Sequence, residues 1–237
     1  MNKSNLLGSM ILAAGASFAA PVFATDFDVT VTNLTRGSYF TPVLLAAHSV
    51  DTTVFSAGAA ASTGLQEMAE GGSIATLSAD LATAGATIVE NPAAGLLGPA
   101  QSTTVAINTD DAVDNTQLTV VAMILPTNDG FIGLNSIDIP TQPGTYQFNV
   151  SAYDAGTEGN DEIRGGGAPN TPGFPAPGPI DTSSGMNGTG VPAVSEGFVH
   201  IHRGVLGDSD IAGGVSDIDS SVHRWLNPIA RVTVTIK

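Results

Sequence analysis

Histidines are the first residues of this 237-residue sequence whose spacing could do chemistry. His200 and His202 stand two positions apart, so both side chains would point to the same face of a strand. Neutral imidazoles suit zinc or copper, and His223 or His48 could complete such a site. Packing of the pair against Trp225, the single tryptophan, is the alternative use.

A second group of candidates is acidic. It lies in one Gly/Ser-rich segment, where carboxylates could hold a cation or could simply face water. We expect a solvated loop and keep the second cation site as the alternative. The residues of this acidic loop are Asp208, Asp210, Asp217 and Asp219.

Motifs of enzyme chemistry are missing from the sequence. It has no nucleophile elbow, no H-E-x-x-H and no phosphate-binding loop. Asp154 and Glu158 could formally be an acid–base pair, but nothing in the sequence raises the pKa of one above that of the other. We therefore assign no catalytic residue and expect a non-enzymatic protein.

Charge and cysteine content narrow the class of partner. The chain carries 7 basic and 22 acidic residues, a net charge of −15, and no cysteine. Such a surface repels nucleic acid and anionic lipid but attracts cations. Without cysteine there is no disulfide framework, no lipid-bearing thiol and no thiolate metal site.

The N-terminus has the three parts of a secretory signal. Lys3 supplies the positive charge, Leu6–Ala20 the apolar stretch, and Val22–Ala24 a cleavage site of small residues. We expect residues 1–24 to be removed after Ala24, which makes the protein secreted or periplasmic. No later stretch has 18 uninterrupted apolar residues, so we expect no stable membrane insertion.

Short alternating or β-branched runs dominate the rest, with turn-rich spacing and little helix. This pattern predicts an all-β fold, an antiparallel β-sandwich, in a single domain over residues 25–237. Two short helices are expected within residues 56–100, and the Gly/Pro-rich residues 165–190 should form a long exposed loop. The expected strands are Asp28–Thr32, Thr103–Ile107, Gln117–Leu125, Phe131–Ile137, Thr145–Tyr153, Gly197–Ile201 and Ile229–Ile236, and the helices Thr63–Ala69 and Ile74–Leu81.

Three stretches occur in an order that resembles the spondin domain, the N-terminal module of F-spondin and mindin. Pro126–Gly133 (PTNDGFIG) is similar to the family's P-S-P-D-W-F-V-G, and Tyr153–Gly159 (YDAGTEG) to its Y/W-D-A-G-T-D-S-G. Asn227–Val234 (NPIARVTV) is similar to P-I-A-R-V, with His223 shortly upstream. The matches cover residues 120–237, and the strand pattern extends them back to Asp28.

The resemblance implies a C2-like sandwich with one bound calcium ion. The carboxylates that match the family's metal ligands are Asp129, Asp154 and Glu158. Glu158 stands where the family has an aspartate, and Gly130 replaces an aromatic residue. The family's paired cysteines are absent, so no adhesion or immune role is carried over.

Strand directions offer an independent test of this site. If Gln117–Leu125 runs up, the next strand runs down and Thr145–Tyr153 runs up, which brings all three carboxylates to one end. They would repel one another there without a cation, although Asp-Gly at 129–130 is also a favoured hairpin turn. The same reasoning places the acidic loop at the opposite end, because Gly197–Ile201 should run down.

Together these observations predict an exported, calcium-binding β-sandwich module with a non-enzymatic binding, adhesion or envelope-associated role. Its partner would be an unidentified extracellular or envelope protein or a glycan. The alternative is a His-dependent copper- or zinc-binding protein or metalloenzyme. A structural envelope protein whose carboxylates only keep it soluble would bind no metal.

Overall fold

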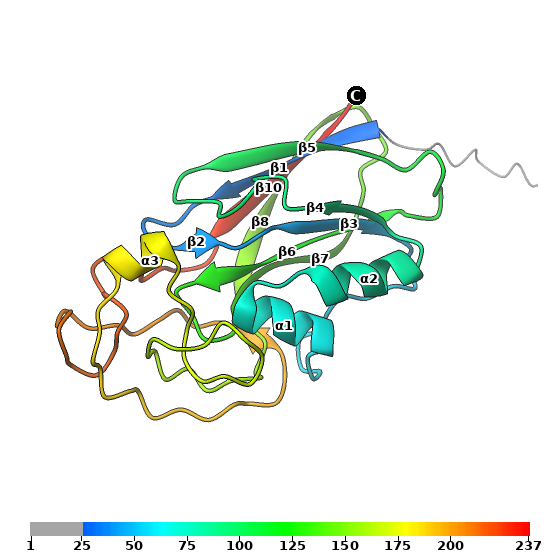
Figure 1. The fold of residues 1–237 in the computed structure, drawn as a ribbon. Helices are drawn as coiled ribbons and strands as arrows, with labels where there is room; N and C mark the ends of the chain where they lie inside the picture. Colours follow the sequence, from blue (N-terminus) through cyan, green and yellow to red (C-terminus); the bar gives the residue numbers. More distant parts are fainter. Residues whose placement is uncertain (1–25) are drawn as a thin grey trace, which may run out of the picture.

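Antiparallel strands make up most of the regular structure in the computed structural model, which describes residues 26–237 (Figure 1). The predicted signal peptide, residues 1–24, lies outside the described residues. The all-β prediction is confirmed. The strands are β1 (Asp26–Asn33), β2 (Tyr39–Phe40), β3 (Leu44–His48), β4 (Thr87–Glu90), β5 (Ser102–Asn108), β6 (Gln117–Leu125), β7 (Gly130–Asp138), β8 (Gly144–Asp154), β9 (His200–Ile201) and β10 (Ala230–Ile236). The helices are α1 (Thr63–Gly71), α2 (Ala75–Thr83) and α3 (Gly178–Ser183).

One strand, β8, joins the two layers of the sheet. Its first part, Gly144–Val150, pairs with β10, and its last four residues pair with β7. The strand order is β4-β3-β6-β7-β8-β10-β1-β5, with β2 on β6 and β9 on β8. β4 and β5 also touch, so the sheet nearly closes on itself. β8 therefore passes from the β10 layer to the β7 layer between Val150 and Ser151.

The main core fills the space between the layers. In β1, alternate residues point inward, and Phe27, Val29 and Val31 are fully buried there. β6 is instead buried along its whole length, as expected for a central strand covered on both faces. Its second face packs with β3 and β7 against α1 and α2 (Figure 1).

Both predicted helices in the 56–100 region form. Ser62 caps α1 by accepting a hydrogen bond from the Leu65 N–H at 3.2 Å, and Gly72 ends it in the left-handed conformation. None of the described helices is long and apolar enough to cross a membrane.

The prediction of one exposed loop over residues 165–190 is only partly right. Residues 178–183 form α3, because Pro179 lies in the first turn, where a helix does not need the proline's missing N–H. Phe174 and Ile180 are also fully buried, in the second apolar cluster, which lies between the sheet and helices α1 and α2. The Gly/Pro-rich segment is thus fastened to the domain by two apolar side chains.

The expected position of the acidic loop is wrong. β9 has only two residues, His200 and Ile201, so it does not carry the chain down the sheet. β10 begins beside Val150, near the upper end of β8, and the segment between β9 and β10 therefore stays at that end. Asp217 accepts the Arg164 N–H at 2.9 Å, which places the acidic loop against the loop that follows β8.

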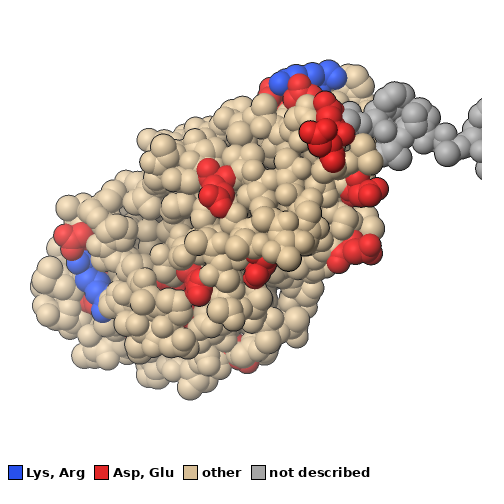
Figure 2. All heavy atoms as spheres, turned by 45° about the vertical axis from the view of Figure 1, so that its right-hand side comes forward, with Lys and Arg blue, Asp and Glu red and all other residues tan. Residues whose placement is uncertain are grey.

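Acidic side chains are dispersed over one face of the molecule. Figure 2 shows them on one face in small groups separated by uncharged surface. Near the C-terminus, Lys237 lies 3.0 Å from Asp28 and 3.7 Å from Asp26. The negative charge of the chain is not gathered on this face into one large patch.

Candidate metal centre

The turn before β7 and the loop after β8 lie side by side. Gly130 pairs with Asp154 at the end of the two strands, and the Ala155 N–H donates to the Asp129 carbonyl at 3.1 Å. The predicted strand order thus brings Asp129 and Asp154 to the same end of the sheet. Glu158 follows in the same loop, four residues beyond Asp154.

Asp129 is fully buried, and its two carboxylate oxygens have different surroundings. Oδ2 accepts the N–H groups of Thr157 at 2.8 Å and Glu158 at 3.0 Å, together with the Thr157 hydroxyl at 3.2 Å. Oδ1 is buried without any hydrogen-bond partner. Burial and the neighbouring Asp154 charge raise the pKa of Asp129 to about 8, although the hydrogen bonds to Oδ2 oppose this.

Glu158 shows the same asymmetry. Its Oε1 accepts the Asn128 amide at 2.8 Å and the Gly173 N–H at 2.5 Å, while Oε2 is buried without a partner. Burial raises the pKa of Glu158. Asn128 also donates to Asp161 at 2.8 Å, so its amide ties two carboxylates of the loop together.

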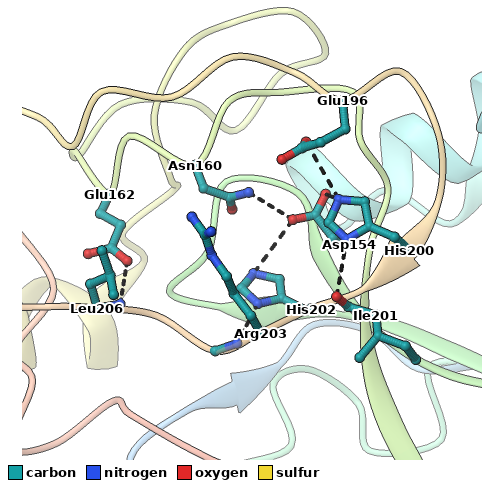
Figure 3. Close-up of a pocket in the computed structure, with 10 residues that line it drawn as sticks. Asp154, Asn160, Glu162, Glu196, His200, Ile201, His202, Arg203 and Leu206 are labelled. Atoms are coloured by element: carbon teal, nitrogen blue, oxygen red, sulfur yellow. Dashed lines mark hydrogen bonds and ion pairs between the residues drawn. The ribbon is translucent and has the colours of Figure 1, made fainter.

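Asp154 lies between these carboxylates and a pair of histidines. Its Oδ1 accepts the Gly156 N–H and its Oδ2 the Asn160 amide, both at 2.8 Å. His200 Nε2 lies 3.5 Å from Oδ1, and His202 Nε2 lies 4.0 Å from Oδ2 (Figure 3). The two histidines are two residues apart on an extended segment, and both therefore face the Asp154 carboxylate.

Gly156 explains how the histidine segment comes so close. Its φ of +67° is in the left-handed region, and a Cβ there would lie 2.2 Å from the Phe198 carbonyl oxygen. The Gly197 N–H donates to the Gly156 carbonyl at 2.8 Å. The glycine of the D-A-G-T sequence therefore allows the chain to turn after β8 and leaves space for the Phe198 backbone to pack against it.

A small pocket opens at this junction. Its volume is about 100 Å³, well below the roughly 300–1,000 Å³ of pockets for drug-sized ligands. The space suits an ion with water better than an organic substrate. Figure 3 shows nine of the lining residues by name: Asp154, Asn160, Glu162, Glu196, His200, Ile201, His202, Arg203 and Leu206.

Among the described residues, one set of three His, Asp or Glu side chains has its ligand atoms within 4.8 Å of one another. This set is Asp154, Glu196 and His200. Asp129 and Glu158 are outside it, so the structure brings the expected calcium ligands into one loop region but not into one tight cluster.

The other two histidines lie elsewhere. His48 Nε2 lies 2.8 Å from the Thr119 hydroxyl, and His223 Nε2 lies 3.2 Å from the Ser183 hydroxyl. The expected packing against Trp225 is found for His202, whose ring centroid lies 5.3 Å from that of the indole. Burial lowers the pKa of His202 to about 4, so its imidazole is neutral at pH 7.

Carboxylates of the acidic loop accept hydrogen bonds from backbone N–H groups. Asp208 Oδ2 accepts the N–H groups of Val215 at 2.7 Å and Ser216 at 2.9 Å, which lowers the pKa of Asp208. Asp217 accepts the Gly188 N–H through Oδ1. These carboxylates organise turns. Asp210 is exposed, as expected for a solvated loop, whereas Asp217 is 2 % exposed, so the expectation is wrong for Asp217.

Three residues of the site were missed from the sequence. Asn128 directly precedes Asp129 in the first spondin-like stretch, and its position beside a proposed ligand could have identified it as a site residue. Asn160 lies just beyond the second stretch. Glu196 belongs to no helix or strand, so its spacing from His200 carried no directional information.

Comparison with protein families decides the relationship. The Spondin_N family matches residues 14–172, about two thirds of the chain. The chain belongs to the spondin N-terminal domain family. The match includes the first two spondin-like stretches, whereas Asn227–Val234 lies beyond it. The curated proteins compared with the chain gave no match. Membership in this family supports an extracellular, non-enzymatic module.

Proposed function

We propose that this spondin domain is exported and binds one calcium ion through Asp129, Asp154 and Glu158, as part of a non-enzymatic binding module. The observation that carries the proposal is the pair of bare oxygens, Asp129 Oδ1 and Glu158 Oε2. Both belong to carboxylates whose other oxygen is fully hydrogen-bonded. A buried carboxylate oxygen without a donor is costly unless a proton or a cation faces it.

The donor chemistry agrees with calcium. Ca²⁺ takes six to eight hard oxygens, and the loop offers carboxylates, the Asn128 and Asn160 amide groups and backbone carbonyls. A bound ion would supply the positive charge that these carboxylates lack. It would also relieve the repulsion between Asp129 and Asp154 that contributes to the raised pKa of Asp129.

Residues of this chain already prearrange the loop. Backbone N–H groups of Thr157 and Glu158 hold Asp129 in place, and the Asn128 side chain holds Glu158 against Asp161. Only the remaining ligand positions would have to close on the ion. The expected result is a more rigid end of the sandwich over residues 126–131 and 154–162.

A binding role is supported by apolar side chains at the same end. The segments between β8 and β10 expose several of them to solvent. A protein or glycan partner would contact this loop surface. The exposed side chains are Val194, Phe198, Ile201, Leu206, Ile211 and Leu226.

Thermal unfolding with and without calcium tests the proposal. Calcium should raise Tm by an amount that grows with its free concentration above Kd. In Asp129→Asn, the same calcium addition should give little or no increase. Asp110→Asn, in an exposed turn, is the matched control and should respond as wild type does. An unchanged Tm for wild type, or an equal increase in Asp129→Asn, would overturn the calcium site.

A further inference from the structure

His200 has one ring nitrogen fixed and the other free. Nδ1 lies 3.1 Å from the Ile201 carbonyl, which can only accept, so Nδ1 carries the hydrogen and the neutral ring has its lone pair on Nε2. A histidine that ligates a metal commonly donates its other N–H to a carbonyl in this way. Nε2 is buried and has no hydrogen-bond partner.

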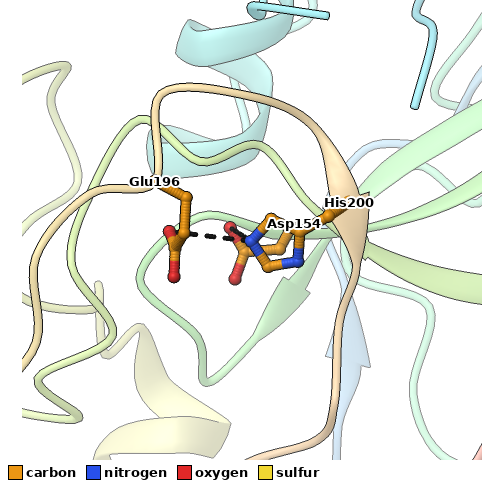
Figure 4. Close-up of side chains that lie close together, drawn as sticks. All are labelled: Asp154, Glu196 and His200. Atoms are coloured by element: carbon orange, nitrogen blue, oxygen red, sulfur yellow. Dashed lines mark ion pairs between the residues drawn. The ribbon is translucent and has the colours of Figure 1, made fainter. Parts of the chain in front are cut away.

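Two carboxylates face this lone pair. Asp154 Oδ1 lies 3.5 Å and Glu196 Oε2 lies 3.6 Å from His200 Nε2. Figure 4 shows the three side chains gathered together. A lone pair opposite two anionic oxygens requires positive charge between them. Either a proton on Nε2 or a metal ion can supply that charge.

The distances favour the metal ion. A charged N–H···O bond brings nitrogen and oxygen to about 2.7–2.9 Å, clearly closer than either contact here. Tetrahedral zinc, with bonds of about 2.0–2.2 Å, separates neighbouring ligand atoms by about 3.4 Å. Both distances to His200 Nε2 are thus close to the spacing of ligands around an ion and longer than a charged hydrogen bond, and all three ligand atoms lie within 4.8 Å of one another.

His202 supplies an independent observation. It is 4 % exposed, its Nδ1 accepts the Gly204 N–H at 3.0 Å, and the hydrogen of the neutral ring is therefore on Nε2. That Nε2 is unpartnered and directed at Asp154 Oδ2, 4.0 Å away. A small rotation of the Asp154 carboxylate toward an ion would be steadied by this buried donor, which makes His202 a positioning residue.

We propose that Asp154, Glu196 and His200 form a second metal site, for a divalent transition metal of which Zn²⁺ fits best. Two carboxylates and a neutral imidazole balance the charge of a dication. The nitrogen donor distinguishes the site from a calcium site, because Ca²⁺ takes oxygen ligands whereas zinc takes both. The adjoining pocket of about 100 Å³ leaves room for water as a fourth ligand.

The two metal sites share Asp154 and differ in every other ligand. Zinc would fasten the segment around Glu196 and His200 to the end of β8, next to the loop that calcium is proposed to order. The zinc site depends on neither Asp129 nor Glu158. Its fate can therefore be measured separately from that of the proposed function.

Calorimetric titration of Zn²⁺ into the calcium-saturated protein tests this inference. Wild type and Asp129→Asn should each bind one zinc ion per chain, and His200→Ala and Glu196→Gln should bind it at least about tenfold more weakly. Co²⁺ in place of zinc should give the visible absorption of a tetrahedral ion in wild type and lose it in His200→Ala.

Folding of the variants is checked by their thermal unfolding, since His200 and Glu196 are partly exposed and should be replaceable. Absence of zinc binding in wild type would show that His200 forms only an imidazolium ion pair and would overturn the site. Equal zinc binding by wild type and His200→Ala would do the same. If Asp129→Asn loses calcium binding but keeps zinc binding, both proposals stand. If His200→Ala loses zinc binding but no variant changes calcium binding, only the zinc site stands.

Discussion

At the scale of single residues, the site is built on carboxylates that are only half satisfied. Asp129 and Glu158 each have one oxygen held by amides and one buried oxygen with no donor. Sequence reasoning selected both residues through a family resemblance, because acidic residues in turns are common. Their burial and bare oxygens depend on contacts between distant loops, which no local pattern reveals.

The raised pKa of Asp129 predicts how the metal-free protein responds to pH. The folded chain holds the Asp129 proton up to about pH 8, whereas its ordinary pKa is 3.8. This contribution to stability is therefore present below pH 3.8 and is lost as pH rises through about 8. Removing the titrating group in Asp129→Asn should make Tm fall less between pH 5 and 8 than in wild type, measured after chelation and dialysis. Parallel pH profiles for the two proteins would contradict the assignment.

Asn128 should couple the two halves of the loop. It is 1 % exposed and donates to both Glu158 and Asp161, so Asn128→Ala removes two hydrogen bonds to charged groups. We expect the free energy of unfolding to fall by about 2–4 kcal/mol. Urea denaturation measures this, with Asn149→Ala at an exposed position of β8 as the control. If the free energy of unfolding falls no more than in the control, the hydrogen bonds from Asn128 to Glu158 and Asp161 do not stabilise the loop.

At the scale of elements, the strands with clear alternation or a dense apolar run were predictable. Gln117–Leu125 matches β6 residue for residue, and Thr145–Tyr153 lies within β8. β3 was missed because Leu44–His48 is buried at every position and so shows no alternation. β4 was missed because its four residues, Thr87–Glu90, are too short a run to show a pattern. β9 was predicted too long, and this single error moved the acidic loop to the wrong end. Glu196 could not be found because tertiary contacts alone bring it to His200.

Gly156 is predicted to be irreplaceable for a reason beyond its backbone angle. Gly156→Ala combines an unfavourable φ with a clash against the Phe198 backbone, whereas Gly58→Ala has φ of +89° and open space. The cost for Gly58→Ala should be about 1 kcal/mol, and that for Gly156→Ala at least twice as large. Denaturation of both variants measures the difference. Equal losses would show that the close approach of Phe198 is unimportant.

At the scale of the whole molecule, polar contacts rather than disulfides hold the loop end together. The chain has no cysteine, and the segments between β8 and β10 contain little regular structure. Glu162, 4 % exposed, accepts the N–H groups of Leu206 and Gly207 and the hydroxyl of Ser216. Bound cations would strengthen such a framework, and a net charge of −15 favours their capture.

Weakening the Glu162 contacts should loosen this end of the molecule selectively. In Glu162→Gln one carboxylate oxygen is replaced by an NH₂ group, which is a donor and cannot accept the hydrogen bonds that this oxygen accepts. We expect the free energy of unfolding to fall by about 2 kcal/mol. Hydrogen exchange should accelerate at Leu206 and Gly207 before it does in the core strands. Glu90→Gln, at an exposed position of β4, is the control. Uniform acceleration across the sheet would argue against a separately fastened loop end.

Calcium titration by calorimetry tests the central claim most directly. Wild type and His200→Ala should each bind one calcium ion, and Asp129→Asn should show no heat of binding at the same concentrations. Thermal unfolding of both variants checks that they remain folded, so that a difference between them reports on the ligands. No calcium binding by wild type, or binding by Asp129→Asn that equals wild type, would contradict the calcium-binding role of this spondin domain.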